Sequence, residues 1–164
     1  MVNLNIIPFP FFIFLVSNCY AQEIQVERMK VSWQHHDEVV SFTASAPDDG
    51  WVALGFNSKD DIVGSNLIMV GVTGSKVTAE DFYVVSAGNP QPVKSLNSES
   101  QIINSSGSEE NGITTVTFSI PIKAFDDYHF DLTKGRKLWL ICAYSMEDEF
   151  DHHSRMRKHV EITL

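Results

Sequence analysis

The chain has 164 residues, with 21 Asp and Glu against 12 Lys and Arg, which gives a formal net charge of -9. This acidic balance argues against nucleic acid as a partner, because phosphate binding needs a cationic surface, and against anionic lipid, which attracts polybasic segments. With 43% hydrophobic and 20% charged residues, the composition is that of a globular domain rather than a disordered chain.

The first 21 residues differ from the rest of the chain. They contain no Asp, Glu, Lys or Arg, and positions 6–16 are almost wholly apolar. A short apolar stretch that ends on small residues is typical of a secretory signal peptide, whereas a bilayer span needs about 20 apolar residues. We therefore predict a signal peptide over 1–21, a single domain over 22–164 without a transmembrane segment, and a secreted or extracytoplasmic location. A retained anchor, or lipidation of Cys19, is the alternative.

The predicted mature domain has the pattern of an all-β protein. Apolar and polar residues alternate over 40–44, 116–120 and 160–164, which is the signature of half-buried strands. Residues 138–144 are apolar on both faces, so we expect a central strand there. Gly, Asn and Pro residues that favour turns separate these runs. Many short strands spaced in this way predict an antiparallel β-sandwich with an immunoglobulin-like arrangement of two sheets.

Two further features bear on the architecture of the domain. Segment 90–111 is rich in Ser, Asn and Glu, and we expect a long surface loop with one weak strand near 101–104. After cleavage the chain keeps one cysteine, Cys142, so an exported domain of this kind has no internal disulfide. Its stability must then come from a packed apolar core.

The sequence lacks the motifs of familiar enzymes. It has no GxSxG elbow, no HExxH, no phosphate-binding Gly-rich loop and no paired-cysteine zinc motif. Cys142 falls in an apolar strand, where a thiol is inert. Because no nucleophile, base and orienting group occur together, we predict that the protein is not an enzyme.

A cluster of charged residues and histidines lies between the last two predicted strands. It spans positions 146–159 and includes His152, His153 and Arg155. Loops held by a rigid sandwich commonly bind ligands. Acidic residues followed by basic ones also pair with one another across a surface loop. The composition of this segment leaves both interpretations open.

Several segments, in order along the chain, carry a resemblance to a known family. They are Val31-Ser32-Trp33, the block GWVALGFN at 50–57, Gly64-Ser65-Asn66, Asp81-Phe82-Tyr83, the strand TVTFSIPI at 115–122, and Phe150-Asp151-His152-His153-Ser154-Arg155. With these pieces, the chain resembles a DOMON domain from about Glu27 to Leu164. The GWVALGFN block with the Gly-Ser-Asn that follows it is the most specific part of the match.

The resemblance implies a secreted β-sandwich that holds a ligand at one end, between its sheets. Haem-binding relatives, such as cytochrome domains of the cellobiose dehydrogenase type, ligate iron with a Met after the GWVALGFN-like strand and a His near the C-terminus, a pair that suits low-spin haem. His153 matches the His position, whereas the Met position falls on Ile62, which has no lone pair to donate. Met69 and Met146 are the nearest thioethers, and a Met in a strand is usually core filler.

The expected site follows from this resemblance. Its residues are Trp51, Phe56 and Ile62 as the pocket lining, Met69 and His153 as haem contacts, and Arg155 as the partner of a haem propionate. The predicted function is a ligand-binding module, with haem b for extracytoplasmic electron transfer as one form and a redox or envelope protein as partner. Carbohydrate binding, or a cofactor-free interaction role in an envelope or extracellular assembly, is the alternative.

Overall fold

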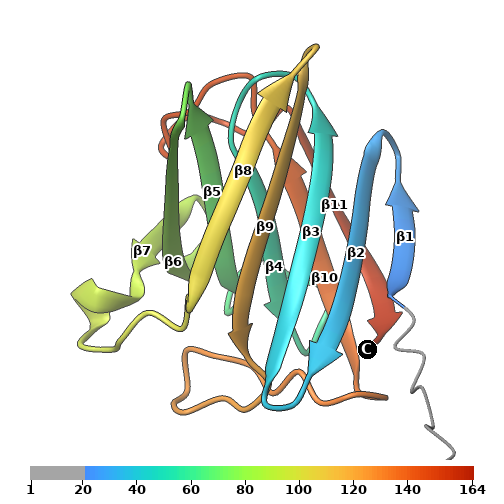
Figure 1. The fold of residues 1–164 in the computed structure, drawn as a ribbon. Coiled ribbons are helices and arrows are strands. Elements are labelled where there is room, and N and C mark those ends of the chain that lie inside the picture. The colour runs from blue at the N-terminus through green and yellow to red at the C-terminus, as the bar shows by residue number, and fades with distance from the viewer. Residues whose placement is uncertain (1–20) are drawn as a thin grey trace, which may run out of the picture.

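The computed structural model describes residues 21–164, so the predicted signal peptide, Cys19 included, lies outside the described residues except for Ala21. The described residues form two antiparallel sheets that pack face to face (Figure 1). The five-stranded sheet consists, in spatial order, of β1 (Gln22–Val26), β2 (Met29–His36), β3 (Val39–Pro47), β9 (Ile113–Pro121) and β8 (Asn104–Glu110). The six-stranded sheet consists, in spatial order, of β11 (Met156–Thr163), β10 (Lys137–Tyr144), β4 (Val52–Asn57), β5 (Asn66–Thr73), β6 (Lys76–Ser86) and β7 (Asn89–Pro92). A short 3-10 helix, η1 (Val93–Leu96), follows β7.

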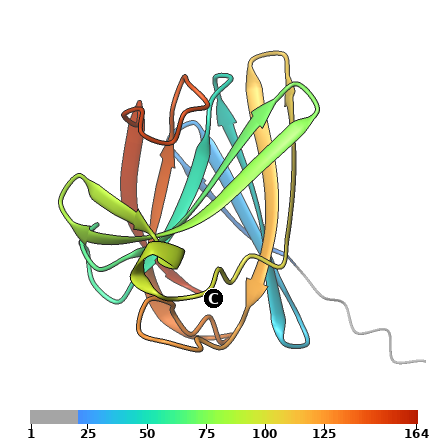
Figure 2. The same cartoon turned by 90° about the vertical axis from the view of Figure 1, so that its left-hand side faces the viewer.

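The predicted all-β sandwich is confirmed, and Figure 2 shows its two sheets as separate layers. The prediction for segment 90–111 is wrong in part, because β8 begins at Asn104 and runs to Glu110. This strand forms because its whole length pairs with β9, a long-range contact that a Ser-rich segment does not reveal. Within residues 21–164, no helix has the length and apolar character needed to cross a membrane.

Aromatic side chains from both sheets meet in the centre of the core. Phe42 of β3 lies 5.6 Å from Phe118 of β9 and 5.1 Å from Phe56 of β4, measured between ring centroids. All three rings are almost completely buried. Burying one such side chain contributes about 1.5–3 kcal/mol, so this cluster fixes the sheets face to face.

The central strands of the six-stranded sheet are buried on both faces. In β4, Leu54 and Phe56 face the core, whereas Ala53 and the preceding Trp51 belong to a second apolar cluster on the outer face. Ala143 of β10 joins that outer cluster. Because successive side chains of a strand point to opposite faces, a strand without polar residues creates two apolar layers. The outer layer must be covered by other parts of the chain.

The loop 145–155 folds back over this outer face. The ring of Phe150 meets the ring of Phe82 edge-on, with 6.1 Å between their centroids. The approach of the loop depends on Gly50, because a Cβ atom there would lie 2.5 Å from the backbone nitrogen of Glu147. A residue larger than glycine at this position would push the loop away from the sheet.

A buried polar network closes one end of the sandwich. Asp81 accepts hydrogen bonds from Asn66 Nδ2 at 2.6 Å and from the backbone nitrogen of Gln101 at 2.9 Å, and Gln101 Nε2 donates to Asn66 Oδ1 at 2.6 Å. His129 Nε2 lies 3.3 Å from Asp81 Oδ2, and its Nδ1 lies 2.6 Å from Asp126 Oδ1. The network ties the connection between β9 and β10, which runs across the end of both sheets in Figure 1, to strands β5 and β6.

The network favours the protonated form of His129. Burial opposes protonation, but hydrogen bonds to Asp81 and Asp126 outweigh it and raise the pKa of His129 above its usual 6.5. Burial alone would also raise the pKa of Asp126, yet hydrogen bonds from Ser98, His129 and the Tyr128 backbone lower it. The two ring nitrogens thus hold His129 between Asp81 and Asp126.

We predict that this arrangement makes stability depend on pH. Because the pKa of His129 is raised on folding, its stabilising contribution is fully present below the unfolded value of about 6.5 and is lost as pH rises through the folded value. The difference in unfolding free energy between the native protein and the His129→Gln variant should shrink as pH increases above 6.5, as measured by urea denaturation. The exposed His152→Gln change is the matched control and should leave the profile unaltered. A difference in unfolding free energy that stays constant with pH would contradict a raised pKa of His129 in the folded protein.

Candidate functional site

A cavity of about 90 Å³ opens on the outer face of the six-stranded sheet. Its lining residues are Trp51, Ala53, Ile62, Leu67, Val84, Gly88, Pro90, Ile141, Ala143, Ser154 and Arg157. Strands β4, β5, β6 and β10 supply an apolar floor, and four connecting segments together with β7 and β11 supply the rest of the lining. The site is thus built on rigid strands and bounded by loops.

Small residues in neighbouring strands make the floor hollow. Ala143 of β10 lies opposite Ala53 of β4, and Gly55 lies between Ile141 and Leu67 in the adjacent row. A Cβ atom at Gly55 would lie 3.1 Å from Ile141 Cβ and 3.2 Å from Leu67 Cδ1. Larger side chains at Ala53 and Ala143, which line the cavity, would fill the depression, whereas a side chain at Gly55 would press against Ile141 and Leu67. The cavity therefore depends on the two alanines.

The loop that carries Ile62 is held in place by its own polar groups. Asn57 Nδ2 donates to the carbonyl oxygens of Asp61 at 2.6 Å and Val63 at 3.2 Å, and Asp61 Oδ1 accepts from the Val63 nitrogen at 2.9 Å. The nitrogen of Gly64 donates to the Val84 carbonyl at 2.8 Å and attaches the loop to β6. These bonds position Ile62 as one wall of the cavity.

Two polar side chains of the lining lack partners among the described residues. Trp51 is only 4% exposed, and its Nε1 donor is buried without a hydrogen bond. Arg157, on the edge strand β11, is exposed and makes no ion pair or side-chain hydrogen bond within residues 21–164. A buried donor without an acceptor costs about 1–3 kcal/mol, so Trp51 marks a place where a ligand atom would be stabilising.

The structure brings together only part of the residue set expected from the sequence. Trp51 and Ile62 line the cavity, and Met69 lies in the same outer-face cluster, 3% exposed. Phe56 instead belongs to the core between the sheets, because its position in β4 has the opposite parity to Ala53. The cavity itself lies on the outer face, whereas the expected ligand site lay between the sheets.

His153 and Arg155 lie beside the cavity but do not line it. Both are exposed; Arg155 Nη1 pairs with Asp48 Oδ1 at 2.9 Å, and the carbonyl oxygen of His153 accepts from the Ser145 hydroxyl at 3.2 Å. Ser154, between them, lines the cavity. Alternation within β11 places Arg157 on the face opposite the core residue Met156, and this signal would have found Arg157. Ser154 lies in the irregular loop before the strand, where no pattern in the sequence indicates its position.

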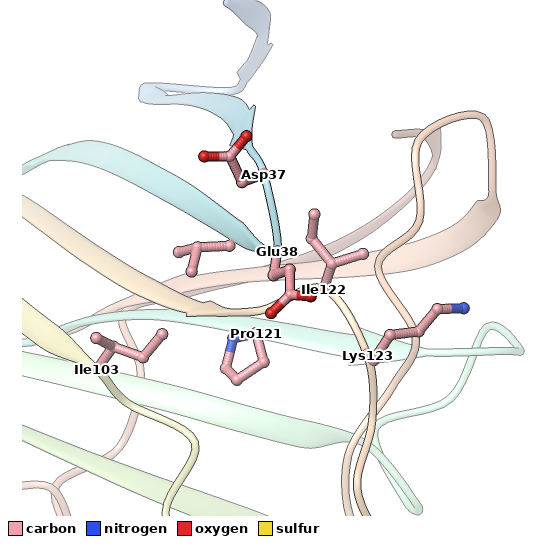
Figure 3. Close-up of a pocket in the computed structure, with 7 residues that line it drawn as sticks. Asp37, Glu38, Ile103, Pro121, Ile122 and Lys123 are labelled. Atoms are coloured by element: carbon pink, nitrogen blue, oxygen red, sulfur yellow. The ribbon is translucent and has the colours of Figure 1, made fainter.

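A wider groove of about 510 Å³ lies at the turn between β2 and β3, and Figure 3 shows the residues that line it. Its walls include Ile103, which is 55% exposed, and Pro121. Lys123 Nζ pairs with Asp131 at 3.3 Å, and the Glu38 carbonyl accepts from the Ile122 nitrogen at 2.8 Å, whereas the carboxylates of Asp37 and Glu38 form no ion pair within residues 21–164. We regard the smaller cavity as the candidate site, because it combines an apolar floor with a buried donor that has no partner among the described residues.

The fold agrees with comparisons to known proteins. Two solved structures have the same two-sheet fold: the cytochrome b domain of pyranose dehydrogenase from Coprinopsis cinerea has a TM-score of 0.60 and 10% identity, covering 82% of this chain and 76% of that one. The cytochrome domain of Myriococcum thermophilum cellobiose dehydrogenase has a TM-score of 0.62 and 9% identity. The match covers 88% of this chain and 81% of that domain's chain. Among curated proteins, no sequence match was found.

The family is established by the sequence itself. The DOMON domain family matches residues 25–145, which is most of the chain. The chain therefore belongs to the DOMON family, as the resemblance predicted.

Six-coordinate haem b does not fit the donor set of this cavity. Haem iron takes imidazole, thioether or thiolate ligands, and no residue of the lining carries one. Ile62 presents only carbon atoms, and His153 lies exposed in the neighbouring loop. The volume of about 90 Å³ also falls well below the roughly 300–1,000 Å³ of typical cofactor and drug pockets. No electron-transfer step follows from this geometry.

Proposed function

We propose that this DOMON-family chain is a ligand-binding module, and that the cavity on the outer face of the six-stranded sheet is its binding site. One observation carries the proposal: an apolar hollow is lined by Trp51, whose indole donor Nε1 is buried without a partner among the described residues. A ligand that fills the hollow would gain the apolar burial, and an acceptor that reaches the indole edge would also supply the missing hydrogen bond.

The size of the cavity limits the part of a ligand that enters it. An apolar protein cavity of about 150 Å³ holds one benzene molecule, so about 90 Å³ suits a branched alkyl group of four or five carbons. Trp51 is too deeply buried to serve as a stacking platform for a sugar ring. The geometry therefore supports a small apolar ligand with an oxygen acceptor more strongly than a carbohydrate.

Binding rather than catalysis is the activity that we assign. Burial raises the pKa of the Cys142 thiol to about 12, so this sulfur stays protonated in the core. The two solved structures of similar fold are domains named as parts of dehydrogenases. That context supports a module that acts beside a partner protein, which we propose also for this chain.

The cavity can be tested with a neutral probe, 4-methylpentanamide. We expect it to bind with a millimolar Kd, the affinity appropriate for about eight non-hydrogen atoms, and to shift the indole N–H signal of Trp51 in ¹H–¹⁵N spectra. Trp51→Phe identifies that signal. Ala143→Val should fill the hollow and abolish binding with little change in unfolding free energy, whereas Ala44→Val, in the core, is a control for overpacking. Unchanged spectra at saturating probe would refute the site.

Haem b gives a second test with a clear expectation. Because no lining residue can ligate iron, the purified protein mixed with haem b should show no six-coordinate low-spin absorption spectrum. The His153→Ala variant should give the same spectrum as the native protein. A low-spin spectrum that disappears in His153→Ala would restore the haem assignment and overturn the small-ligand one.

We also propose that the chain is exported and cleaved after Ala21. The start of β1 at Gln22, whose Oε1 accepts from Trp33 Nε1 at 2.8 Å, supports a folded domain that begins directly after this site. The full chain produced in a secreting host should yield protein with Gln22 as its first residue, as determined by mass spectrometry. Ala21→Arg, which removes the small residue that cleavage requires, should leave the precursor unprocessed. A secreted product that retains residues 1–21 would exclude this processing.

A further inference from the structure

The rim of the cavity carries a positive charge that the protein leaves free. Arg157 faces Ala143 across the β10–β11 pair, and Ala143 in turn faces Ala53 on the cavity floor. The guanidinium of Arg157 thus stands at the edge of an apolar depression. β11 is the edge strand of its sheet, so this side chain is open to a molecule approaching from solvent.

The basic side chains next to Arg157 in the sequence already have acidic partners. Arg155 pairs with Asp48 at 2.9 Å and Lys158 with Glu27 at 3.0 Å, and His159 Nδ1 lies 2.8 Å from Asp60 Oδ1. Within residues 21–164, no carboxylate forms an ion pair with Arg157. In a chain with a formal net charge of -9, an arginine that has no acidic partner beside an apolar cavity calls for a negative group from outside.

We infer that the ligand is a small carboxylate with a branched alkyl group, which places its alkyl group in the hollow and its carboxylate against Arg157. The apolar floor and the volume of about 90 Å³ select the alkyl group. The planar guanidinium matches a carboxylate with two parallel hydrogen bonds. This inference rests on the proposed function, since it names the ligand class of the same site.

The test compares 4-methylpentanoate with 4-methylpentanamide, which differ only in the charged group. In the native protein the acid should bind about fivefold to tenfold more tightly than the amide, an exposed arginine contributing modestly because water and salt screen it. Arg157→Gln should remove this preference, so that the acid and the amide bind to the variant with equal affinity. Arg155→Gln is the matched control, because Arg155 is exposed but lies outside the lining, and it should keep the preference.

The outcomes separate this inference from the proposed function. Equal binding of acid and amide to the native protein would overturn the carboxylate assignment and leave the cavity as a binding site. Absence of binding by both would overturn the proposed function itself. A preference that survives in Arg157→Gln would assign the charge recognition to another residue and refute the inference.

A branched alkyl group beside a carboxylate occurs both in a free small acid and at the C-terminus of a peptide that ends in leucine. Acetyl-Gly-Gly-Leu and its C-terminal amide distinguish these sources. Tighter binding of the peptide acid than of 4-methylpentanoate would identify a chain terminus as the carboxylate. Weaker binding of the peptide acid would identify a free small acid. Either result, with its Arg157 dependence, supports recognition of a branched carboxylate.

Discussion

The double-sided burial of the six-stranded sheet is the constraint on which the rest of this structure depends. Strands β4, β5 and β10 present apolar side chains to both faces, so one set builds the core and the other needs a second cover. The aromatic cluster around Phe42 satisfies the inner face. On the outer face, loops rather than a third sheet supply the cover, and they cover it incompletely. The candidate site is the part of the apolar layer that the loops leave open.

Two sets of backbone contacts decide where that opening lies. The loop 145–155 approaches the sheet closely because Gly50 has no side chain, and it covers one side with Phe150. The loop 58–65 is held in place by hydrogen bonds of Asn57 and Asp61, and its Ile62 covers another side of the outer face. Between these loops, the small lining residues Ala53 and Ala143 leave the remaining space unfilled. Fixed loops and a fixed floor give a preformed cavity, which lowers the entropic cost of binding.

The family fold and the local chemistry of this chain point to different ligands. The similar solved structures are cytochrome domains, yet the cavity here has no imidazole or thioether in its lining. A fold supports many sites, and the function follows from the side chains at the site rather than from the fold. In the lining of the cavity, an indole N–H and a guanidinium have no partner among the described residues. These groups recognise oxygen atoms and negative charge rather than iron.

Much of the architecture could be predicted from the alternation of apolar and polar residues alone. The strands at 40–44, 116–120 and 138–144 carry patterns strong enough to fix their type, and the two apolar faces of 138–144 already indicated a central strand. The strand β8 could not be predicted, because its Ser-rich sequence is stabilised by pairing with β9 rather than by its own pattern. Likewise, the network around His129 joins residues from separate connections, and no spacing in the sequence indicates their contact.

The sequence by itself determined the sandwich, the family and the membership of Trp51 and Ile62 in one neighbourhood, because period-two alternation and the GWVALGFN block are local properties. Only the tertiary structure decided which face each residue occupies around the cavity. Phe56 lies in the core, and Ser154 and Arg157, rather than His153 and Arg155, line the site. For Phe56 the physical reason is parity, because a shift of one or three residues along a strand moves a side chain to the opposite face. For Arg157 the reason is the register of β11, which pairs it with Ala143, and Ser154 lies in a loop whose path the sequence does not specify.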